Sequence, residues 1–355
     1  RGGGTGRGIR DGHLKRVHEP GVKEQVEDMR QTYEPFDPPH CPPTPTPDYP
    51  REYPVLDIIK NWNPDDPNYR PDNIYSSLCY FDYSVESDLS AAFAFRDAEV
   101  PFVVRGVPDL DDTVMRWADP LYLRKLLKGK EYKVEKSEDN HFMYWRNGKS
   151  TKKLRGWKEP THMTKMTYDR WLESASKTHD ARGTHYYFRV SGCSKHGGCP
   201  QPNLMEIFDE LPIFKPKPSL FMVSPKEQRG IHCRFGQSGV IAENHFDGSR
   251  NMIALMGGER RYILSAPSNC KGMHLLPKDH PSGRHSAVDW SNPDLEAFPR
   301  FSSVTSNEVV LQPGDVLYLP TQWFHYIVSL GTNYQCNTRS GRETGSDADI
   351  HACGF

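Results

Sequence analysis

The chain contains two stretches in which short apolar runs are separated by glycine or proline turns, and these constrain its fold more than any other feature. One runs from Gly236 to Leu264 (GQSGVIAENHFDGSRNMIALMGGERRYIL) and the other from Pro313 to Ser329 (PGDVLYLPTQWFHYIVS). In the first, the apolar run Met252–Met256 is followed by a Gly257-Gly258 bend and the run Arg261–Leu264. Short apolar runs bounded by turn residues are typical of β-strands. We therefore expect both stretches to belong to one β core.

Each stretch also holds residues that suit a metal ion. His245 and Asp247 are two residues apart, so in an extended backbone both side chains leave the same face of the strand. His325 follows a loop that can return it toward the same centre. Two imidazoles and one carboxylate on one side of a metal leave positions open, which is the arrangement of non-haem Fe(II) oxygenases. An H-x-D pair alone is weak evidence in a chain with fifteen histidines, so the prediction depends on the surrounding strands.

Taken together, these motifs resemble the JmjC and cupin-like 2-oxoglutarate oxygenases, most closely the protein hydroxylases among them. Two further segments share the resemblance: Ala98–Val107 (AEVPFVVRGV) looks like the entry segment of that family, and Thr184–Val190 (THYYFRV) looks like the strand before its core. The resemblance implies a mainly β fold with flanking helices. Its core would be a double-stranded β-helix, or jelly roll, with a helical N-terminal extension.

We expect four regions along the chain. Residues 1–50 read as a Pro/Gly-rich, non-globular arm, because prolines favour extended polyproline conformations. Residues 51–180 form a helical extension packed on the core, with the entry strand near 100–107; the apolar spacing within Asp111–Leu127 is helical. Residues 181–341 form the β-helix core, and residues 342–355 form a C-terminal tail.

The resemblance implies Fe²⁺ as the metal and 2-oxoglutarate as the co-substrate. In the family a lysine about fifteen residues after the first ligand binds the far carboxylate of 2-oxoglutarate, and here Arg260 stands at that position. Arginine can bind a carboxylate through two hydrogen bonds. If the strand register differs by one residue, Arg261 takes the role. Asn251 and Asn337 match family positions that contact the co-substrate or face inward near it.

A second departure from the family pattern lies at Ala242, where related hydroxylases carry a threonine that helps to hold the co-substrate. One lost neutral hydrogen bond costs about 0.5–1.5 kcal/mol, which weakens binding without abolishing it. The substrate would contact loops around the mouth of the barrel, and we assign Arg250 and Trp323 to this role.

The function expected from these features is hydroxylation of a side chain of a protein or peptide by an Fe(II)/2-oxoglutarate-dependent oxygenase. One alternative is a catalytically inactive JmjC-like fold that serves as a structural or binding subunit. The intact ligand triad opposes this alternative, and Arg260 and Ala242 favour it. Another alternative is a cupin metalloenzyme that does not use 2-oxoglutarate.

Charge and hydropathy limit the partners. The formal charge is −1, from 45 basic and 46 acidic residues, so no global field attracts nucleic acid or an anionic membrane, and we expect no nucleic-acid partner. No apolar run approaches the roughly 18 residues of a membrane-spanning helix. The chain does not begin with methionine, so an N-terminal anchor that has been removed stays an alternative.

The eight cysteines (41, 79, 193, 199, 233, 270, 336 and 353) permit disulfides without forming the dense framework of a small secreted domain. Cys193, His196 and Cys199 lie close together, but a structural zinc site needs a fourth ligand, so we favour a disulfide-closed or flexible loop there. The Pro-Thr-Pro segment of the arm favours the lumen of the secretory pathway. The cytoplasm and an organelle matrix are the alternatives.

Overall fold

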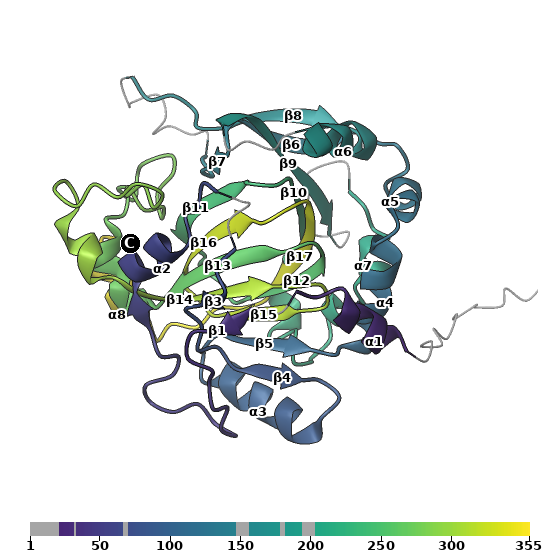
Figure 1. Cartoon of the computed structure of the whole chain (residues 1–355), viewed down its shortest axis with the longest axis horizontal. Coiled ribbons are helices and arrows are strands. Elements are labelled where there is room, and N and C mark those ends of the chain that lie inside the picture. Colours follow the sequence, from purple (N-terminus) through teal and green to yellow (C-terminus); the bar gives the residue numbers. More distant parts are fainter. Residues whose placement is uncertain (1–20, 32, 67–69, 147–155, 178–181, 194–202) are drawn as a thin grey trace, which may run out of the picture.

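A computed structural model describes residues 21–31, 33–66, 70–146, 156–177, 182–193 and 203–355. Two β-sheets dominate this part of the chain (Figure 1). The nine-stranded sheet has the order β4 (Tyr80–Asp82), β5 (Phe102–Arg105), β15 (Val316–Leu319), β12 (Asn251–Gly257), β17 (Asn333–Arg339), β10 (Ile231–Gly236), β9 (Arg182–Gly192), β6 (Tyr132–Asp139) and β8 (His162–Met166). The six-stranded sheet has the order β2 (Tyr53–Pro54), β14 (Thr305–Leu311), β13 (Arg260–Ser265), β16 (Phe324–Ser329), β11 (Ile241–Phe246) and β7 (His141–Phe142). Outside these sheets, β1 (Glu34–Pro35) pairs with β3 (Asn73–Ile74).

The two sheets pack against each other through one apolar layer. Ile253 and Leu255 of β12 meet Tyr262 and Leu264 of β13 in this layer. The alternate residues of β12 are also buried, because Met252 and its neighbours on that face pack under helices. Burial on both faces explains why this strand reads as a continuous apolar run. The structure is therefore the mainly β, double-stranded β-helix that the sequence predicts.

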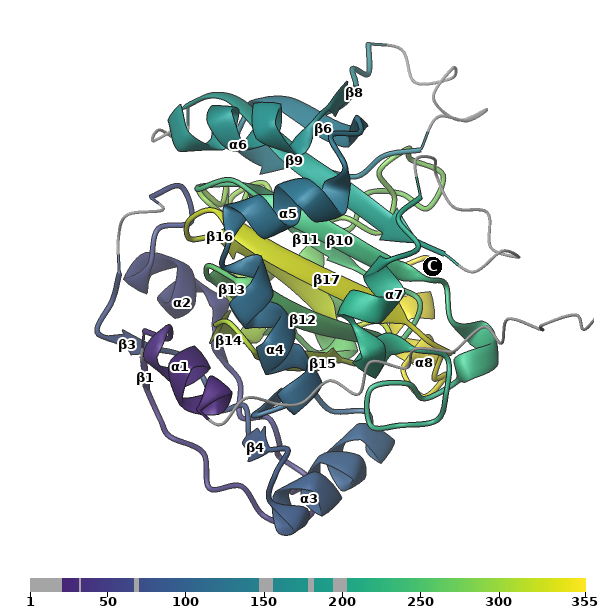
Figure 2. The same ribbon diagram turned by 90° about the vertical axis from the view of Figure 1, so that its right-hand side faces the viewer.

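Helices cover the outer faces of both sheets. Figure 2 shows α1 (Val22–Asp28), α4 (Pro108–Trp117), α5 (Pro120–Leu127) and α7 (Ile207–Glu210) in front of the larger sheet, and α6 (Tyr168–Lys177) and α3 (Glu86–Asp97) lie at its two ends. Buried side chains of these helices form one core cluster with that sheet. On the other side, α2 (Val55–Asn61) packs on the smaller sheet. The short helix α8 (Asp347–His351) contributes Ile350 to the same cluster. None of the described helices has both the length and the apolarity needed to cross a membrane.

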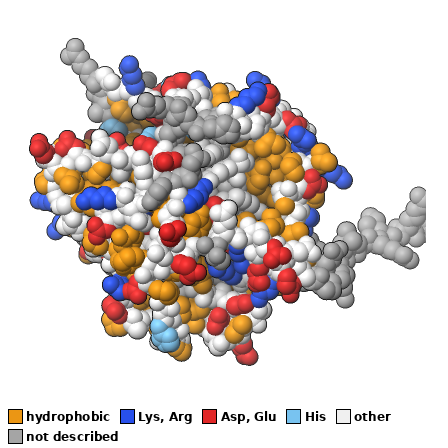
Figure 3. All heavy atoms as spheres, in the orientation of Figure 1, with side chains coloured by type: hydrophobic (Ala, Val, Ile, Leu, Met, Phe, Trp, Pro, Cys, Tyr) orange, Lys and Arg blue, Asp and Glu red, His pale blue; other side chains and the backbone are white. Residues whose placement is uncertain are grey.

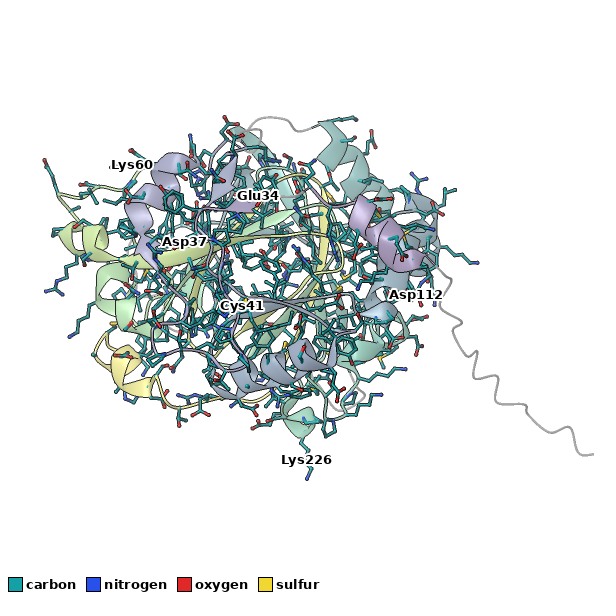
Figure 4. The ribbon with its side chains drawn as sticks, turned by 60° about the horizontal axis from the view of Figure 1, so that its bottom comes forward. Glu34, Asp37, Cys41, Lys60, Asp112 and Lys226 are labelled. Atoms are coloured by element: carbon teal, nitrogen blue, oxygen red, sulfur yellow. A yellow bond between two sulfur atoms is a disulfide. The ribbon has the colours of Figure 1, made fainter. Side chains whose placement is uncertain are left out.

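The N-terminal regions are more closely tied to the core than the predicted arm and helical extension suggest. Residues 1–20 lie outside the described part, but Val26 of α1 is fully buried. In Figure 4, the segment with Glu34, Asp37 and Cys41 runs along the face that is at the bottom of Figure 1. The region predicted as a helical extension also supplies strands: β5, within the predicted entry segment, pairs with β15, and β6 pairs with β9.

Disulfides hold both ends of the chain to the domain. Cys41 is bonded to Cys79, and Cys353 is bonded to Cys270. A third bond joins Cys233 of β10 to Cys336 of β17, which are directly opposite in the register of these strands. In the described part of the chain no cysteine is free. Cys193 is disulfide-bonded, whereas His196 and Cys199, the other residues of the disfavoured zinc site, lie outside the described residues.

Candidate metal centre

The antiparallel strands β11 and β16 bring His245 and His325 together as direct partners in the strand register. Asp247 follows β11 immediately, and His325 Nε2 lies 4.0 Å from Asp247 Oδ2. One potential ligand atom from each of the three residues lies within 4.8 Å of the others. Ligands to a single metal ion, each at about 2.0–2.2 Å, are separated by comparable distances. The three residues that the sequence singles out therefore converge on one point.

A β-bulge in β11 sets the direction of His245. The register passes from Ala242 opposite Ile327 to His245 opposite His325, so β11 contains one more residue than its partner over this interval. Residues three apart in a regular strand face opposite sides. Here Ala242 and His245 both line the same cavity. The bulge therefore turns His245 inward.

Backbone carbonyls fix the orientation of both imidazoles. His245 Nδ1 donates to the carbonyl oxygen of Glu243 at 2.7 Å, and His325 Nδ1 donates to that of Trp323 at 3.0 Å. A carbonyl oxygen only accepts, so the proton of each neutral ring is on Nδ1. Each Nε2 is then left with a free lone pair, which is how metal-binding histidines are commonly arranged.

The charge states of the three residues also suit a cation. Burial lowers the pKa of His245 to about 3 and also lowers the pKa of His325, so both rings are neutral near pH 7. Burial favours the protonated form of Asp247, but the guanidinium of Arg339 and the other basic side chains nearby together outweigh it and hold the pKa of this carboxyl well below its usual range. Two neutral imidazoles and one carboxylate are a donor set that fits ferrous iron.

Arg339 and two asparagines surround the carboxylate. Arg339 Nη2 donates a hydrogen bond to Asp247 Oδ2, and Asn251 Nδ2 lies 3.5 Å from the same oxygen. Asn337 Nδ2 donates to Asn251 Oδ1 at 2.8 Å. Sequence reasoning missed Arg339, although it is two residues after the inward-facing Asn337. The period of two along β17 was the signal that could have found it.

A further histidine, also missed, lies against the first ligand. His285 belongs to the connection between β13 and β14, and its ring stacks on that of His245. This connection is hydrogen-bonded to β11, where Ser286 N donates to the carbonyl oxygen of Asn244 at 2.9 Å. Residues in such a connection follow no strand or helix period, so no pattern in the sequence indicated His285.

These residues open onto a cavity of about 580 Å³. This volume is within the range typical of small-molecule sites, about 300–1,000 Å³. Its described lining includes all three candidate ligands and the surrounding polar residues, namely His245, Asp247, Asn251, His285, His325, Asn337 and Arg339. The cavity can therefore place a small organic molecule next to a bound metal.

The structure puts Arg260 and Arg261 on opposite faces of β13. Arg261 points away from the cavity and forms a fully buried ion pair with Glu308, with Nε 2.7 Å from Oε2. Arg260 points inward, but its Nε donates to Asn333 Oδ1 at 2.6 Å and its Nη1 donates to Gln335 Oε1. Neither arginine is among the described residues that line the cavity.

Arg234 of β10 lines the cavity, and it is a neighbour of Gln335 and Arg189 in the strand register. Burial lowers the pKa of Arg234 to about 9. Within the described chain, no carboxylate forms an ion pair with it. Its Nη1 donates a hydrogen bond to the carbonyl oxygen of Cys233 at 3.2 Å. Its side chain can therefore accept an anionic partner.

The two residues predicted to contact substrate have other contacts. Arg250 binds two carboxylates, with Nε 2.5 Å from Glu99 Oε1 and Nη2 3.2 Å from Glu343 Oε2. Trp323 belongs to the apolar layer between the sheets. Neither is among the described lining residues of the cavity.

Comparison with known proteins agrees with this geometry. The family model described as "Cupin-like domain" matches residues 91–339. Jumonji C domain-containing protein 5 of Drosophila melanogaster is 30% identical over 131 residues, which is 35% of this chain and 32% of that protein. Lysine-specific demethylase 8 of Xenopus tropicalis is 31% identical over 135 residues, 36% of this chain and 30% of that protein. tRNA wybutosine-synthesizing protein 5 of Danio rerio is 27% identical over 129 residues, 36% of this chain and 35% of that protein. The matched stretch thus spans about a third of the length of each of these relatives.

Proposed function

The chain belongs to the JmjC and cupin-like domain family, and we propose that it is an Fe(II)- and 2-oxoglutarate-dependent oxygenase that hydroxylates a side chain of a protein or peptide. The observation that supports this most strongly is the convergence of His245, Asp247 and His325 at the wall of the cavity. All three are in the protonation state that a divalent cation needs. A structural subunit has no need of such an arrangement.

Ferrous iron bound by these three residues would supply the redox chemistry that couples reduction of O₂ to oxidative decarboxylation of 2-oxoglutarate. The protein's part is to hold the ligands and shape the space around them. The carbonyl groups of Glu243 and Trp323 keep the two imidazoles in the metal-binding tautomer. Arg339 helps to keep Asp247 ionised and restricts its rotation through a hydrogen bond. The three ligands approach from one side and leave the cavity side open to the co-substrate.

We assign the far carboxylate of 2-oxoglutarate to Arg234. The sequence points to Arg260, but two amide oxygens already occupy donors of its guanidinium and it does not reach the described cavity wall. Arg234 lines the cavity and has no carboxylate partner in the described chain. Asn251 and Asn337 line the cavity beside Asp247. Their amides are placed to contact the end of the co-substrate nearer the metal.

The proposal is tested by adding Fe(II), 2-oxoglutarate and O₂ to the purified protein and measuring succinate. Turnover above that of an Asp247→Ala variant is the expected result, and peptides that stimulate it are candidate substrates. Metal binding without succinate release would favour a cupin metalloenzyme that does not use 2-oxoglutarate. A protein that binds no metal would favour a structural or binding subunit.

The disulfides support a proposal about location. Cys41–Cys79, Cys233–Cys336 and Cys270–Cys353 are each closed. Disulfides persist in oxidising compartments and are rare in the cytosol. We therefore propose that the protein works in the lumen of the secretory pathway or outside the cell. Mass spectrometry of the non-reduced protein from its native source would show these three links, and free thiols at these positions would contradict the proposal.

A further inference from the structure

We propose that the cavity contains an anion site, formed by Arg284 with Arg146, that binds an acidic or phosphorylated side chain of the substrate. The proposal rests on the proposed function only in taking the occupant of the cavity to be a peptide. It concerns which peptides the cavity accepts.

The charge of the cavity is the first argument. Its described lining contains six side chains that are cationic at neutral pH and two that are anionic. The cationic ones are Lys133, Arg146, Arg189, Arg234, Arg284 and Arg339, and the anionic ones are Glu135 and Asp247. A ferrous ion would add two positive charges and the 2-oxoglutarate dianion two negative ones, so the pair leaves the excess of four positive charges unchanged. A cationic substrate would be repelled by this excess, whereas an anionic one would reduce it.

Two arginines near the metal centre are available for such a substrate. Arg189 is paired with Glu135, and Arg339 is paired with Asp247. Among the described residues no carboxylate forms an ion pair with Arg284 or Arg146. Arg284 is half-buried, and its guanidinium lies over the ring of Phe246, 6.0 Å from the centroid. Phe246 is the residue between His245 and Asp247, so this guanidinium lies beside the ligand strand.

The backbone holds Arg284 in this place at a cost. Its φ is +75°, in the left-handed region, which is uncommon for a residue other than glycine. Residues held in such conformations cluster at functional sites. The carbonyl oxygen of Arg284 accepts a hydrogen bond from Phe246 N at 3.4 Å. Nearby, Arg146 N donates to the carbonyl oxygen of Pro281 at 3.0 Å, which joins the two arginine-bearing segments. Burial lowers the pKa of Arg284; Asp247 opposes this effect, and the proximity of Arg146 adds to it.

A peptide fits the charge distribution better than a nucleic acid. The chain as a whole has a formal charge of −1, and Figure 3 shows basic and acidic side chains interspersed over the face in view. Proteins that bind nucleic acid neutralise several phosphates with a basic stripe or patch. A concentration of cations inside a cavity of about 580 Å³ suits one or two anionic groups on an inserted side chain.

Binding of short peptides to the full chain tests the proposal without turnover. Four probes with an uncharged dye are compared by fluorescence anisotropy: ten-residue peptides with glutamates, with phosphoserine or with lysines at the same central positions, and a ten-nucleotide single-stranded RNA. We expect the glutamate or the phosphoserine peptide to bind at least about tenfold more tightly than the lysine peptide, because hydrogen bonds between charged groups are stronger than those between neutral ones. The stronger of the two anionic peptides identifies the source of the anion.

Matched variants show where the peptide binds. Arg284→Gln should lower the affinity for the anionic peptide about tenfold, and Arg284→Lys should lower it less. Arg146→Gln should add to the effect of Arg284→Gln. Arg300→Gln is the control, because Arg300 is exposed and is not among the cavity residues. Equal binding of the lysine peptide, tighter binding of the RNA, or no effect of Arg284→Gln in a folded protein would overturn the proposal. None of these readouts needs iron or succinate release, so failure of the oxygenase proposal would be seen separately.

Discussion

The ring of His285 is stacked on the ring of His245, with centroids 4.9 Å apart and planes inclined by 22°. His285 Nδ1 lies 3.0 Å from the carbonyl oxygen of Ser282, which fixes the outer ring. Burial and the neighbouring His245 lower the pKa of His285 to about 3, so it adds no charge next to the candidate ligand. The connection between β13 and β14 thus supports the metal centre by packing.

This packing predicts that His285→Ala weakens metal binding while His285→Phe preserves it. An aromatic pair contributes about 0.5–1.5 kcal/mol beyond area burial, so the alanine variant should lose about two- to tenfold in affinity. Phenylalanine keeps the stacked ring without a nitrogen ligand. Titration with Mn(II), which is stable in air, measures the affinity of each variant. Equal affinities of the alanine and phenylalanine variants would show that stacking has no role.

The ligand triad predicts a metal-dependent stability. A metal at a hundred times its Kd should stabilise the folded chain by about 2.7 kcal/mol, and a chelator should reverse the effect. His325→Ala and Asp247→Ala should abolish the stabilisation, since each removes a donor. The exposed His351 gives a matched control in His351→Ala. Thermal unfolding with and without metal measures the stabilisation, and mass spectrometry measures the metal content of each variant. Retained metal in both triad variants would place the site elsewhere.

The environments of Arg234 and Arg260 predict different kinetic effects. Arg234→Met should raise the KM for 2-oxoglutarate about tenfold or more, because it removes one charge-assisted hydrogen bond. The fold should stay intact. Arg229→Met is the control, because Arg229 is exposed and is not among the cavity residues. Arg260→Met should mainly lower stability, since it leaves Asn333 Oδ1 without its donor and removes one of the two donors to Gln335 Oε1, the other being the hydroxyl of Tyr262. If Arg260→Met is stable and raises the KM for 2-oxoglutarate, and Arg234→Met leaves that KM unchanged, then Arg260 and not Arg234 binds the far carboxylate.

The buried ion pair between Arg261 and Glu308 predicts that Arg261 stabilises the folded protein. Both side chains of the Arg261–Glu308 pair are fully buried, and removing one partner of such a pair costs about 3–5 kcal/mol. Arg261→Met should therefore lower the free energy of unfolding by this amount. Adding Glu308→Gln removes the unpaired charge and keeps an acceptor for the backbone N–H of Tyr75, which Glu308 Oε1 binds at 2.8 Å. The double variant should recover part of the loss in urea unfolding; the rest remains, because the carbonyl oxygens of Trp62 and Ile58 still lack the hydrogen bonds from Arg261. A double variant no more stable than Arg261→Met would contradict this account.

His141 predicts a pH dependence of stability. Its Nε2 lies 3.2 Å from Asp65 Oδ1 and its Nδ1 2.5 Å from Glu243 Oε1. Burial alone would lower the pKa of His141, but these two carboxylates raise it to about 10. The pKa in the unfolded chain is about 6.5, so the folded state holds the proton more tightly. The stabilisation is complete below about pH 6.5 and is lost as the pH rises toward 10.

The stability difference between the natural chain and a His141→Gln variant should accordingly shrink between pH 6.5 and pH 10 in urea unfolding. His162, which is exposed and hydrogen-bonded to Glu159, provides the control variant His162→Gln. A difference that grows with pH would show that the imidazole is neutral in the folded protein.

The resemblance to the JmjC and cupin-like family predicted the fold class, and the short apolar runs between turn residues predicted the strands of the core, because these are local signals. The sequence also predicted which three residues meet in the centre, although their role as ligands stays a prediction. It could not decide between Arg260 and Arg261. Both faces of β13 are buried, with Tyr262 in the layer between the sheets and Ile263 under the outer cover, so hydrophobicity does not tell the inner face from the outer one.

The remaining site residues depend on tertiary structure. The bulge in β11 is a property of the pairing with β16 and has no sequence signature of its own. Arg234 lines the cavity because β10 lies between β9 and β17 in the larger sheet. His285 and Arg284 are placed by hydrogen bonds between an irregular connection and β11. Such contacts between distant segments are decided by the whole fold.

The connection that carries Arg284 and His285 leaves from β13 and returns to β14, and these two strands are themselves paired over their length. Changes in the rest of this connection that keep His285 and the hydrogen bond from Ser286 N to the carbonyl oxygen of Asn244 therefore need not disturb the ladder that aligns His245 with His325. A descendant of this gene could vary the residues around Arg284, and with them the substrates it accepts, while it keeps His285 and the ligand strands. Selection on substrate choice and selection on the metal centre could then act on different residues of the same domain.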